Sequence, residues 1–161
     1  MSREYTISGG GLTVAGVTTL VAIRPAANCA LEILRMWVNQ SATATSAQQR
    51  IQWGRETFSV APTFTSATPQ KMKEGDPISQ IVGGATQAVG TAGINASAEG
   101  TSSKSPIGHD SFNNVGGFVW LPTPDETIVL SPSGSGFYLF FPTAPGSLTL
   151  WDFGVAYREI G

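Results

Sequence analysis

One stretch constrains the fold of this chain more than any other, and it spans residues 111–125, S-F-N-N-V-G-G-F-V-W-L-P-T-P-D. It contains an apolar run of period two, in which Phe118 and Trp120 point to one face and the residues between and after them point to the other. Pro122 and Pro124 end the run, because proline has no amide hydrogen to donate to a β-ladder. We therefore predict a β-strand here, central in its sheet, where regular structure resumes after a long tract of small and polar residues.

Runs of the same kind recur along the chain, and no segment has a convincing helical pattern. They are dense in β-branched and aromatic residues, which favours strands. In the last third of the chain they are separated by S-P-S-G-S and P-T-A-P-G, which are turn compositions. The predicted strands cover residues 12–24, 30–40, 48–58, 127–130, 136–141 and 147–159 in addition to the run above. About eight strands with turn signals between them predict an all-β fold, an antiparallel β-sandwich of the jelly-roll type.

Residues 30–40 are ambiguous, because apolar positions such as Leu34 and Met36 fit a helix as well as a strand. Trp37 favours a pleated surface, and the S-A-T-A-T-S that follows is a poor helix end and a good hairpin loop. We assign a strand and expect it to pair in antiparallel fashion with residues 48–58.

The length of 161 residues is sufficient for one domain with a substantial core. Residues 1–11 are expected to form an N-terminal strand or arm, and residues 12–161 a single jelly-roll-like β-sandwich domain. Within that domain, residues 61–110 are expected to form a long irregular excursion with several prolines, a charged patch and a tract of small residues at 83–104. A structureless segment of that length is uncommon inside a compact domain, so we expect it either to pair in part as edge strands or to pack on a partner.

The charge content excludes some partners. Charged residues make up only 12% of the chain, and the formal net charge is −2. Nucleic acid and anionic membrane surfaces both attract basic proteins, so we expect neither as a partner. Much of the surface must then consist of small and uncharged polar residues, which favours burial of part of it against a partner. The chain has no secretory signal and no apolar run near the roughly 18 residues that span a bilayer, so we expect it to fold in a cytoplasm.

No catalytic, cofactor-binding or metal-binding site is predicted. His109 is the only histidine, and the consecutive residues His109-Asp110-Ser111 cannot form a serine triad, whose members meet from separate segments. The chain lacks a calcium-loop pattern and a phosphate-binding glycine loop. Cys29 is the only cysteine, which excludes an internal disulfide and multi-cysteine metal sites, and we expect a buried thiol. The four tryptophans lie in predicted strands as core or interface residues, with an exposed platform for sugars as the alternative.

Three short pieces carry a resemblance to a known group of proteins. They are I-R-P-A at residues 23–26, S-F-N at 111–113 and W-L-P-T-P at 120–124. In these pieces and in strand spacing the chain resembles small virion proteins of tailed bacteriophages, of the jelly-roll capsid decoration type, also called cement or auxiliary head proteins. The sequence departs from that group at Asp125, where the group has glutamate, and at residues 83–104, which have no counterpart there.

The resemblance implies a structural protein rather than an enzyme, made in the host cytoplasm and located on the outer capsid surface of the virion. It implies two partners, the major capsid protein of the phage and further copies of the chain, in a homotrimer that clamps neighbouring capsomers. The candidate capsid or subunit interface is Trp120, Leu121 and Pro122, together with Tyr5 and Ile7, which precede a triple glycine.

An N-terminal arm at residues 2–11 is hypothesised to grip a neighbouring subunit, and part of the tract at residues 83–104 is expected to be buried against a subunit or the shell. The competing hypothesis is a carbohydrate-binding or tail-associated receptor-binding β-sandwich module.

Overall fold

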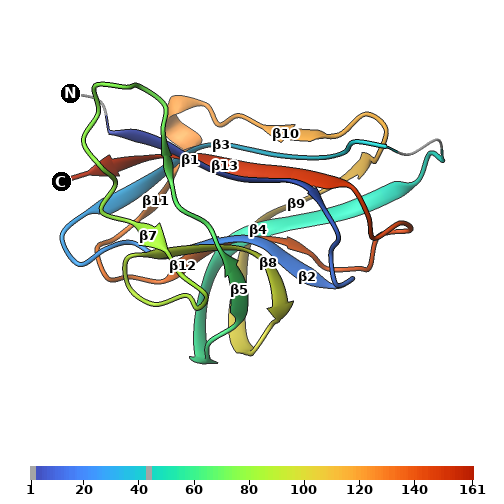
Figure 1. The fold of residues 1–161 in the computed structure, drawn as a ribbon, viewed down its shortest axis with the longest axis horizontal. Helices are drawn as coiled ribbons and strands as arrows, with labels where there is room; N and C mark the ends of the chain where they lie inside the picture. Colours follow the sequence, from blue (N-terminus) through green and yellow to red (C-terminus); the bar gives the residue numbers. More distant parts are fainter. Residues whose placement is uncertain (1–2, 43–44) are drawn as a thin grey trace.

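The computed structural model describes residues 3–42 and 45–161, which form a sandwich of two β-sheets (Figure 1). Over these residues there are thirteen strands and one short 3₁₀ turn, η1 (Pro124–Glu126), and no α-helix. All strand pairs are antiparallel except the two-residue contact of β7 with β8. The predicted all-β antiparallel sandwich is therefore confirmed.

The first sheet is built around the C-terminal strand. Its order is β10 (Phe118–Trp120), β3 (Ala30–Gln40), β13 (Trp151–Ile160), β1 (Glu4–Leu12) and β6 (Gln70–Lys71), and β11 (Ile128–Leu130) also pairs with β3. The second sheet has the order β5 (Thr63–Ser66), β8 (Thr91–Ala98), β2 (Thr18–Ile23), β12 (Gly136–Phe141), β4 (Gln48–Val60) and β9 (Thr101–Asn113), and β7 (Val82–Gly83) pairs with β8.

The connectivity is that of a jelly roll with inserted strands. If the inserted strands β5 to β8 are left out and β10 and β11 are counted as one, the remaining strands can be numbered from one to eight along the chain. They are β1, β2, β3, β4, β9, β10 with β11, β12 and β13. The first sheet then has the order first, eighth, third, sixth, and the second has the order second, seventh, fourth, fifth. Strands distant in sequence thus become neighbours in two four-stranded sheets, as in the double Greek key of jelly rolls.

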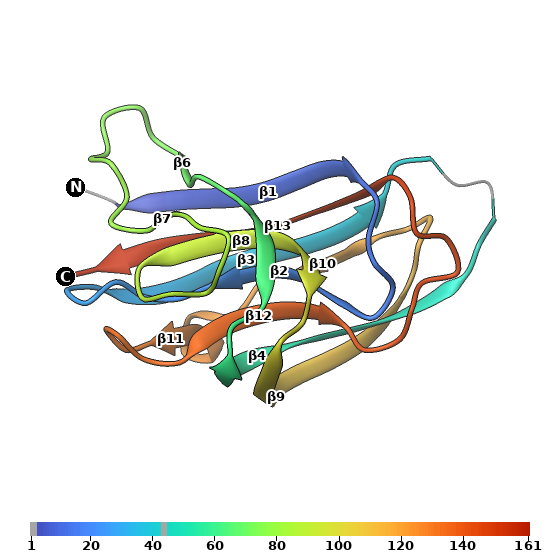
Figure 2. The same cartoon turned by 60° about the horizontal axis from the view of Figure 1, so that its bottom comes forward.

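The segment expected to be an irregular excursion, residues 61–110, contains β5 to β8 and most of β9. Strands β5 to β8 extend the sandwich on the β1 side, because β6 pairs with β1 while β8 pairs with β2 and β5 with β8. Strand β9 instead pairs with β4, at the opposite edge of the second sheet. Figure 2 shows the inserted segment along the β1 side and β9 and β11 on the opposite side. The expected alternative that part of this segment pairs as edge strands is therefore the one found, but the sequence did not show where the strands lie, because their Gly, Ala, Ser and Thr residues have no apolar alternation.

A β-bulge in β3 explains why the apolar pattern of residues 30–40 is ambiguous between helix and strand. The ladder with β13 joins Ile33 to Tyr157 and Arg35 to Ala156, so Leu34 is an extra residue in a β-bulge. Before the bulge the buried side chains are at odd-numbered positions, such as Ile33, and after it they are at even-numbered positions, such as Met36.

The expected pairing of β3 with β4 is wrong, because the two strands belong to opposite sheets. The connection predicted as a hairpin loop crosses between the sheets instead, and its residues Thr43 and Ala44 lie outside the described residues.

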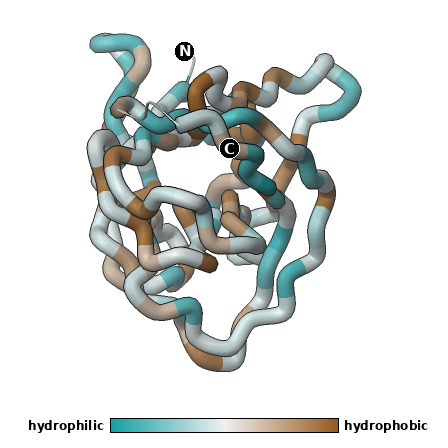
Figure 3. Tube along the Cα trace, turned by 90° about the vertical axis from the view of Figure 1, so that its right-hand side faces the viewer, coloured by the Kyte–Doolittle hydropathy of each residue, from teal (hydrophilic) through white to brown (hydrophobic). Residues whose placement is uncertain are grey.

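The core lies between the sheets and draws on nearly every strand. Alternating hydrophobic and hydrophilic residues along the Cα trace reflect strands with one buried face (Figure 3). The largest side chains in the core are aromatic, and Trp151, for example, packs edge-on to Phe141 with ring centroids 4.9 Å apart. Cys29 is buried as expected, and burial raises the pKa of its thiol.

The stretch around β10 is not a central strand. Residues 111–113 are the end of β9 in the second sheet, and Phe118–Trp120 form β10, an edge of the first sheet. The preceding turn reaches this edge through Gly117, whose φ of 72° is in the region that favours glycine. The predicted alternation is nonetheless confirmed, since Phe118 is buried while Val119 is exposed.

Candidate interaction surface

Two of the five predicted interface residues are not on the surface. Tyr5 and Ile7 lie in β1, between β13 and β6, and their side chains are buried in the core of the sandwich. The Tyr5 ring packs on Tyr157, with centroids 5.6 Å apart. The prediction that they contact a capsid or a neighbouring subunit is therefore wrong, and the segment forms the strand β1 (Glu4–Leu12) rather than a free arm. Ser2, the first residue of the hypothesised arm, lies outside the described residues.

The other three predicted residues lie together at the end of β10. Trp120 is half-buried and packs against the core, with its ring centroid 6.1 Å from that of Trp53. Leu121 is 67% exposed, and Pro122 is partly exposed. Two strands separate β10 from β1 in the sheet, so the structure does not bring this segment together with Tyr5 and Ile7.

A shallow groove adjoins β10 on the outer face of the first sheet. It has a volume of about 350 Å³. Val119, which is 62% exposed, pairs with Trp37 across the ladder and forms one wall, and Gly116 and Gly117 leave space at one end. Arg35 also lines the groove, which we call the β10 groove.

Trp37 is not a free aromatic platform. The guanidinium carbon of Arg35 lies 5.0 Å from the ring centroid, in a cation–π contact that covers one face. The six-membered ring also packs against Gly154 so closely that a β-carbon there would lie 2.2 Å from Cζ2 of Trp37. Little of this ring is left for a sugar to stack on.

Residues 72–81, here called the strap, connect β6 to β7 along the β1 side of the sandwich. The strap is tied to β1 by three hydrogen bonds. The amide of Glu4 donates to Oδ2 of Asp76 at 3.3 Å, the hydroxyl of Tyr5 donates to the carbonyl of Pro77 at 3.0 Å, and the amide of Met72 donates to the carbonyl of Glu4 at 3.0 Å.

A buried polar network ties the strap to β13 as well. Oε1 of Glu159 accepts hydrogen bonds from the hydroxyl of Ser79 at 2.6 Å and from the amide of Gln80 at 2.8 Å. Ser79 also contacts the hydroxyl of Tyr157 at 3.0 Å. Burial is the main cause that raises the pKa of Tyr157. Sequence reasoning missed this network, because no motif links residues about 80 positions apart.

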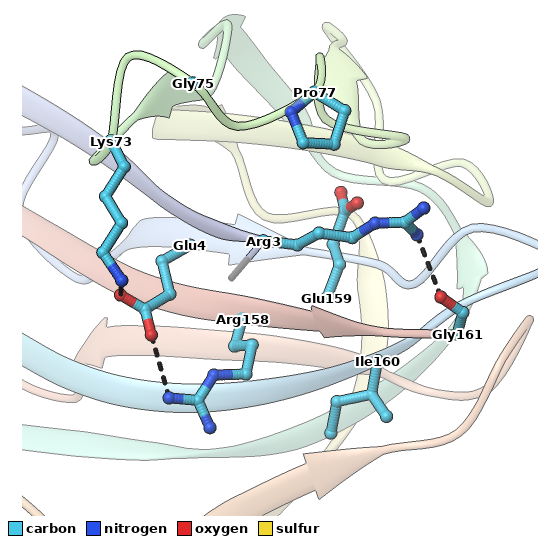
Figure 4. A pocket seen from close by; sticks show the side chains of 9 residues that line it. All are labelled: Arg3, Glu4, Lys73, Gly75, Pro77, Arg158, Glu159, Ile160 and Gly161. Carbon is cyan, nitrogen blue, oxygen red and sulfur yellow. Dashed lines mark hydrogen bonds and ion pairs between the residues drawn. The ribbon is translucent and has the colours of Figure 1, made fainter. Parts of the chain in front are cut away.

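A hollow beside the strap is lined by paired charges (Figure 4). Glu4 lies between Lys73, at 3.5 Å, and Arg158, at 2.8 Å. Arg158 also reaches Glu32 at 3.1 Å. The hydrogen bond to Glu4 is the main cause that raises the pKa of Arg158. Arg3 also lines the hollow and donates a hydrogen bond to the carbonyl of Gly161 at 3.0 Å, so each of the three cations there has a partner within the chain.

A second buried charge group, which we call the charge cluster, lies on the second sheet. Glu56 of β4 is 2% exposed and faces Lys104 of β9 across the ladder, with Nζ 3.2 Å from Oε2. Lys104 is also 3.2 Å from Oε2 of Glu99, which accepts a hydrogen bond of 2.7 Å from the Thr19 hydroxyl. Neither oxygen of Glu56 has a hydrogen bond of good geometry within the described residues, so the ion pair is its main compensation. Burial raises the pKa of Glu56, and Lys104 opposes the shift.

The chemistry-bearing residues considered from the sequence lie apart from any such cluster. His109 is exposed on β9, and the carboxylate of Asp110 accepts a hydrogen bond from the backbone of Ser111 at 2.7 Å. Two further carboxylates, those of Asp125 and Glu126, lie in the exposed turn η1. Across residues 3–42 and 45–161, no group of three or more His, Cys, Asp or Glu side chains is arranged to hold a metal ion. Over the same residues, no helix has the length and apolarity needed to cross a membrane.

Of the predicted interface residues, Trp120, Leu121 and Pro122 thus lie together at the β10 edge, beside the β10 groove. Comparison with models of protein families, with curated proteins and with solved structures found no match to this chain.

Proposed function

We propose that this protein is a structural virion protein of a tailed bacteriophage, which decorates and stabilises the outer capsid as an oligomer, expected to be a homotrimer. The observation that carries the proposal is the position of the sequence W-L-P-T-P. It follows a strand anchored by buried Phe118 and half-buried Trp120, and it holds Leu121 and Pro122 at the surface on a sheet edge. The pieces that resemble decoration proteins therefore include an exposed apolar contact on a rigid support.

The proposed mechanism is mechanical. A protein that binds across capsomer junctions stabilises the assembled shell over free subunits by mass action. At a free concentration 100 times the dissociation constant, each occupied site is stabilised by about 2.7 kcal/mol. A surface with few charges suits this role, because contact with the shell then desolvates few ions.

The test is occupancy of capsids that lack the protein. Purified protein is mixed with expanded heads from a phage deleted for its gene, and the bound fraction is measured after sedimentation. We expect saturable binding and a higher temperature of shell disruption. We expect Leu121→Asp to weaken binding at least tenfold, and Val60→Asp, which changes a similarly exposed apolar residue at the far end of β4, to bind as wild type. Absence of binding by the wild-type protein refutes the proposal.

The competing proposal, a carbohydrate-binding or receptor-binding module, loses support from the covered ring of Trp37. The other tryptophans are buried or packed against the core, so none offers a free face of the usual kind. A glycan array with reproducible binding, together with no binding to capsids, would favour this alternative.

A further inference from the structure

We infer that copies of this chain associate head to tail, with Ile78 of one copy's strap inserted in the β10 groove of the next copy. The inference deepens the proposed function and rests on its oligomeric part. It names the two surfaces that would meet.

The strap presents an apolar side chain on a fixed support. Ile78 is 83% exposed, the most exposed of the large hydrophobic residues that the structure describes. Its neighbours on both sides are tied down, since Pro77 accepts the hydrogen bond from Tyr5 and Ser79 is buried against Glu159. A flexible loop would lose conformational entropy on binding, whereas this one is already ordered. An isoleucine held outward on such a support is suited to insert into a pocket of a partner.

The β10 groove has the complementary form. Its volume of about 350 Å³ and its apolar wall, made by Val119 and the part of Trp37 that Arg35 and Gly154 leave uncovered, suit an aliphatic side chain with the adjoining backbone. One exposed charge on each surface is complementary, because Glu74 of the strap and Arg35 of the groove have opposite signs. The exposed Lys73 of the strap is paired with Glu4. These features favour the strap of a second copy as the occupant.

The positions of the two surfaces determine the kind of assembly. In the first sheet, β6, from which the strap continues, and β10 lie at opposite edges. Figure 2 shows the strap along one side of the molecule, away from β9 and β11 on the other side. Two different surfaces on opposite sides make a heterologous contact, which generates a ring when the rotation closes. A ring of three is the arrangement that the proposed homotrimer requires.

The experiment compares the solution mass of full-length wild type with Ile78→Asp, Val119→Asp and the control Val60→Asp. Light scattering is recorded over a range of concentrations, and circular dichroism establishes that each variant is folded. We expect wild type and Val60→Asp at three times the chain mass of 16.8 kDa. Each of the other two variants is expected to dissociate at least tenfold more readily, because a carboxylate would be buried in the contact without a partner.

A mixture distinguishes this contact from a symmetric one. The Val119→Asp protein keeps an intact strap and the Ile78→Asp protein keeps an intact groove, so together they retain one good contact. We expect a 1:1 complex in the mixture at concentrations where neither variant associates alone.

Three results overturn the inference: a monomeric wild type, an oligomer that survives both substitutions, or a mixture without the 1:1 complex. The capsid experiment is read separately. A monomer that binds capsids would refute head-to-tail association and leave the decoration proposal standing, and an oligomer that binds no capsid would do the reverse.

Discussion

Replacement of Lys104 by methionine tests whether the charge cluster is held together by its single cation. Glu56 is almost completely buried, and Lys104 is the cation that faces it at 3.2 Å. The ammonium group also lies over the rings of Tyr138 and Phe140, at 5.4 and 4.8 Å from their centroids. Methionine preserves most of the apolar stem and removes the charge, so the variant leaves the Glu56 carboxylate buried and unpaired.

The expected loss of unfolding free energy at pH 7 is about 3 kcal/mol, the lower end of the 3–5 kcal/mol typical for breaking a buried ion pair. The lower end applies because the Lys104 side chain is 16% exposed and Glu99 competes for it. For a domain of this size, such a loss lowers Tm by roughly 6–12 °C. Urea unfolding followed by tryptophan fluorescence, at one fixed protein concentration, measures it.

The dependence on pH gives a second readout. Burial raises the pKa of Glu56 in the folded state above its unfolded value, and loss of Lys104 raises it further. A carboxyl group whose pKa is raised in the folded state does not lower the free energy of unfolding below its unfolded pKa, because it is protonated in both states there. It lowers that free energy as pH rises through the folded pKa. The difference in stability between wild type and variant should therefore shrink between pH 7 and about pH 4.5.

The matched control is the double variant with Glu56→Gln and Lys104→Met, which removes the buried charge and should recover part of the loss. A cost below 1 kcal/mol at pH 7, or a cost that is the same at pH 4.5 and pH 7, would refute the reasoning that an unpaired buried carboxylate dominates.

Three further predictions concern the strap, the groove and the N-terminal strand. Ser79→Ala leaves the buried carboxylate of Glu159 short of a donor, which should cost about 1–3 kcal/mol and speed tryptic cleavage within the strap; unchanged cleavage would contradict the anchoring role. Gly154→Ala places a methyl group against Trp37, which should cost about 1–3 kcal/mol and shift the tryptophan emission, whereas an unaltered spectrum and stability would argue against that packing. Deletion of residues 1–10 removes most of β1 and should abolish cooperative unfolding in calorimetry, and a truncated protein with native Tm would show that β1 is dispensable.

Some elements of this fold follow from the sequence because their determinants are local. The run predicted at residues 136–141 is β12 with the same bounds, and that at 48–58 is β4 shortened by two residues. Period-two alternation and Pro- or Gly-rich turns depend on neighbours in the chain, so they can be recognised from the sequence without a structure. Enough such runs at even spacing were sufficient to predict a sandwich of the jelly-roll type.

The surface was only partly predictable for a related reason. Exposure of Leu121 follows from its place after an edge strand, and the resemblance at residues 120–124 directed attention to it. Tyr5 and Ile7 have the same apolar character, yet they are buried because β13 and β6 flank their strand. An apolar side chain in a terminal strand has the same sequence signature whether it faces a neighbour or its own core.

The sequence by itself determined the class of fold, the approximate strands and the scarcity of charge. Only the tertiary structure decided that β3 and β4 lie in opposite sheets and that β5 to β8 extend one side of the sandwich while β9 lies at the opposite edge. It also decided that Glu56, Lys104 and Glu99 meet, as do Ser79 and Glu159. The physical reason is that alternation records which face of a strand is apolar, whereas strand partners and buried polar contacts depend on backbone pairing and packing between residues far apart in the chain.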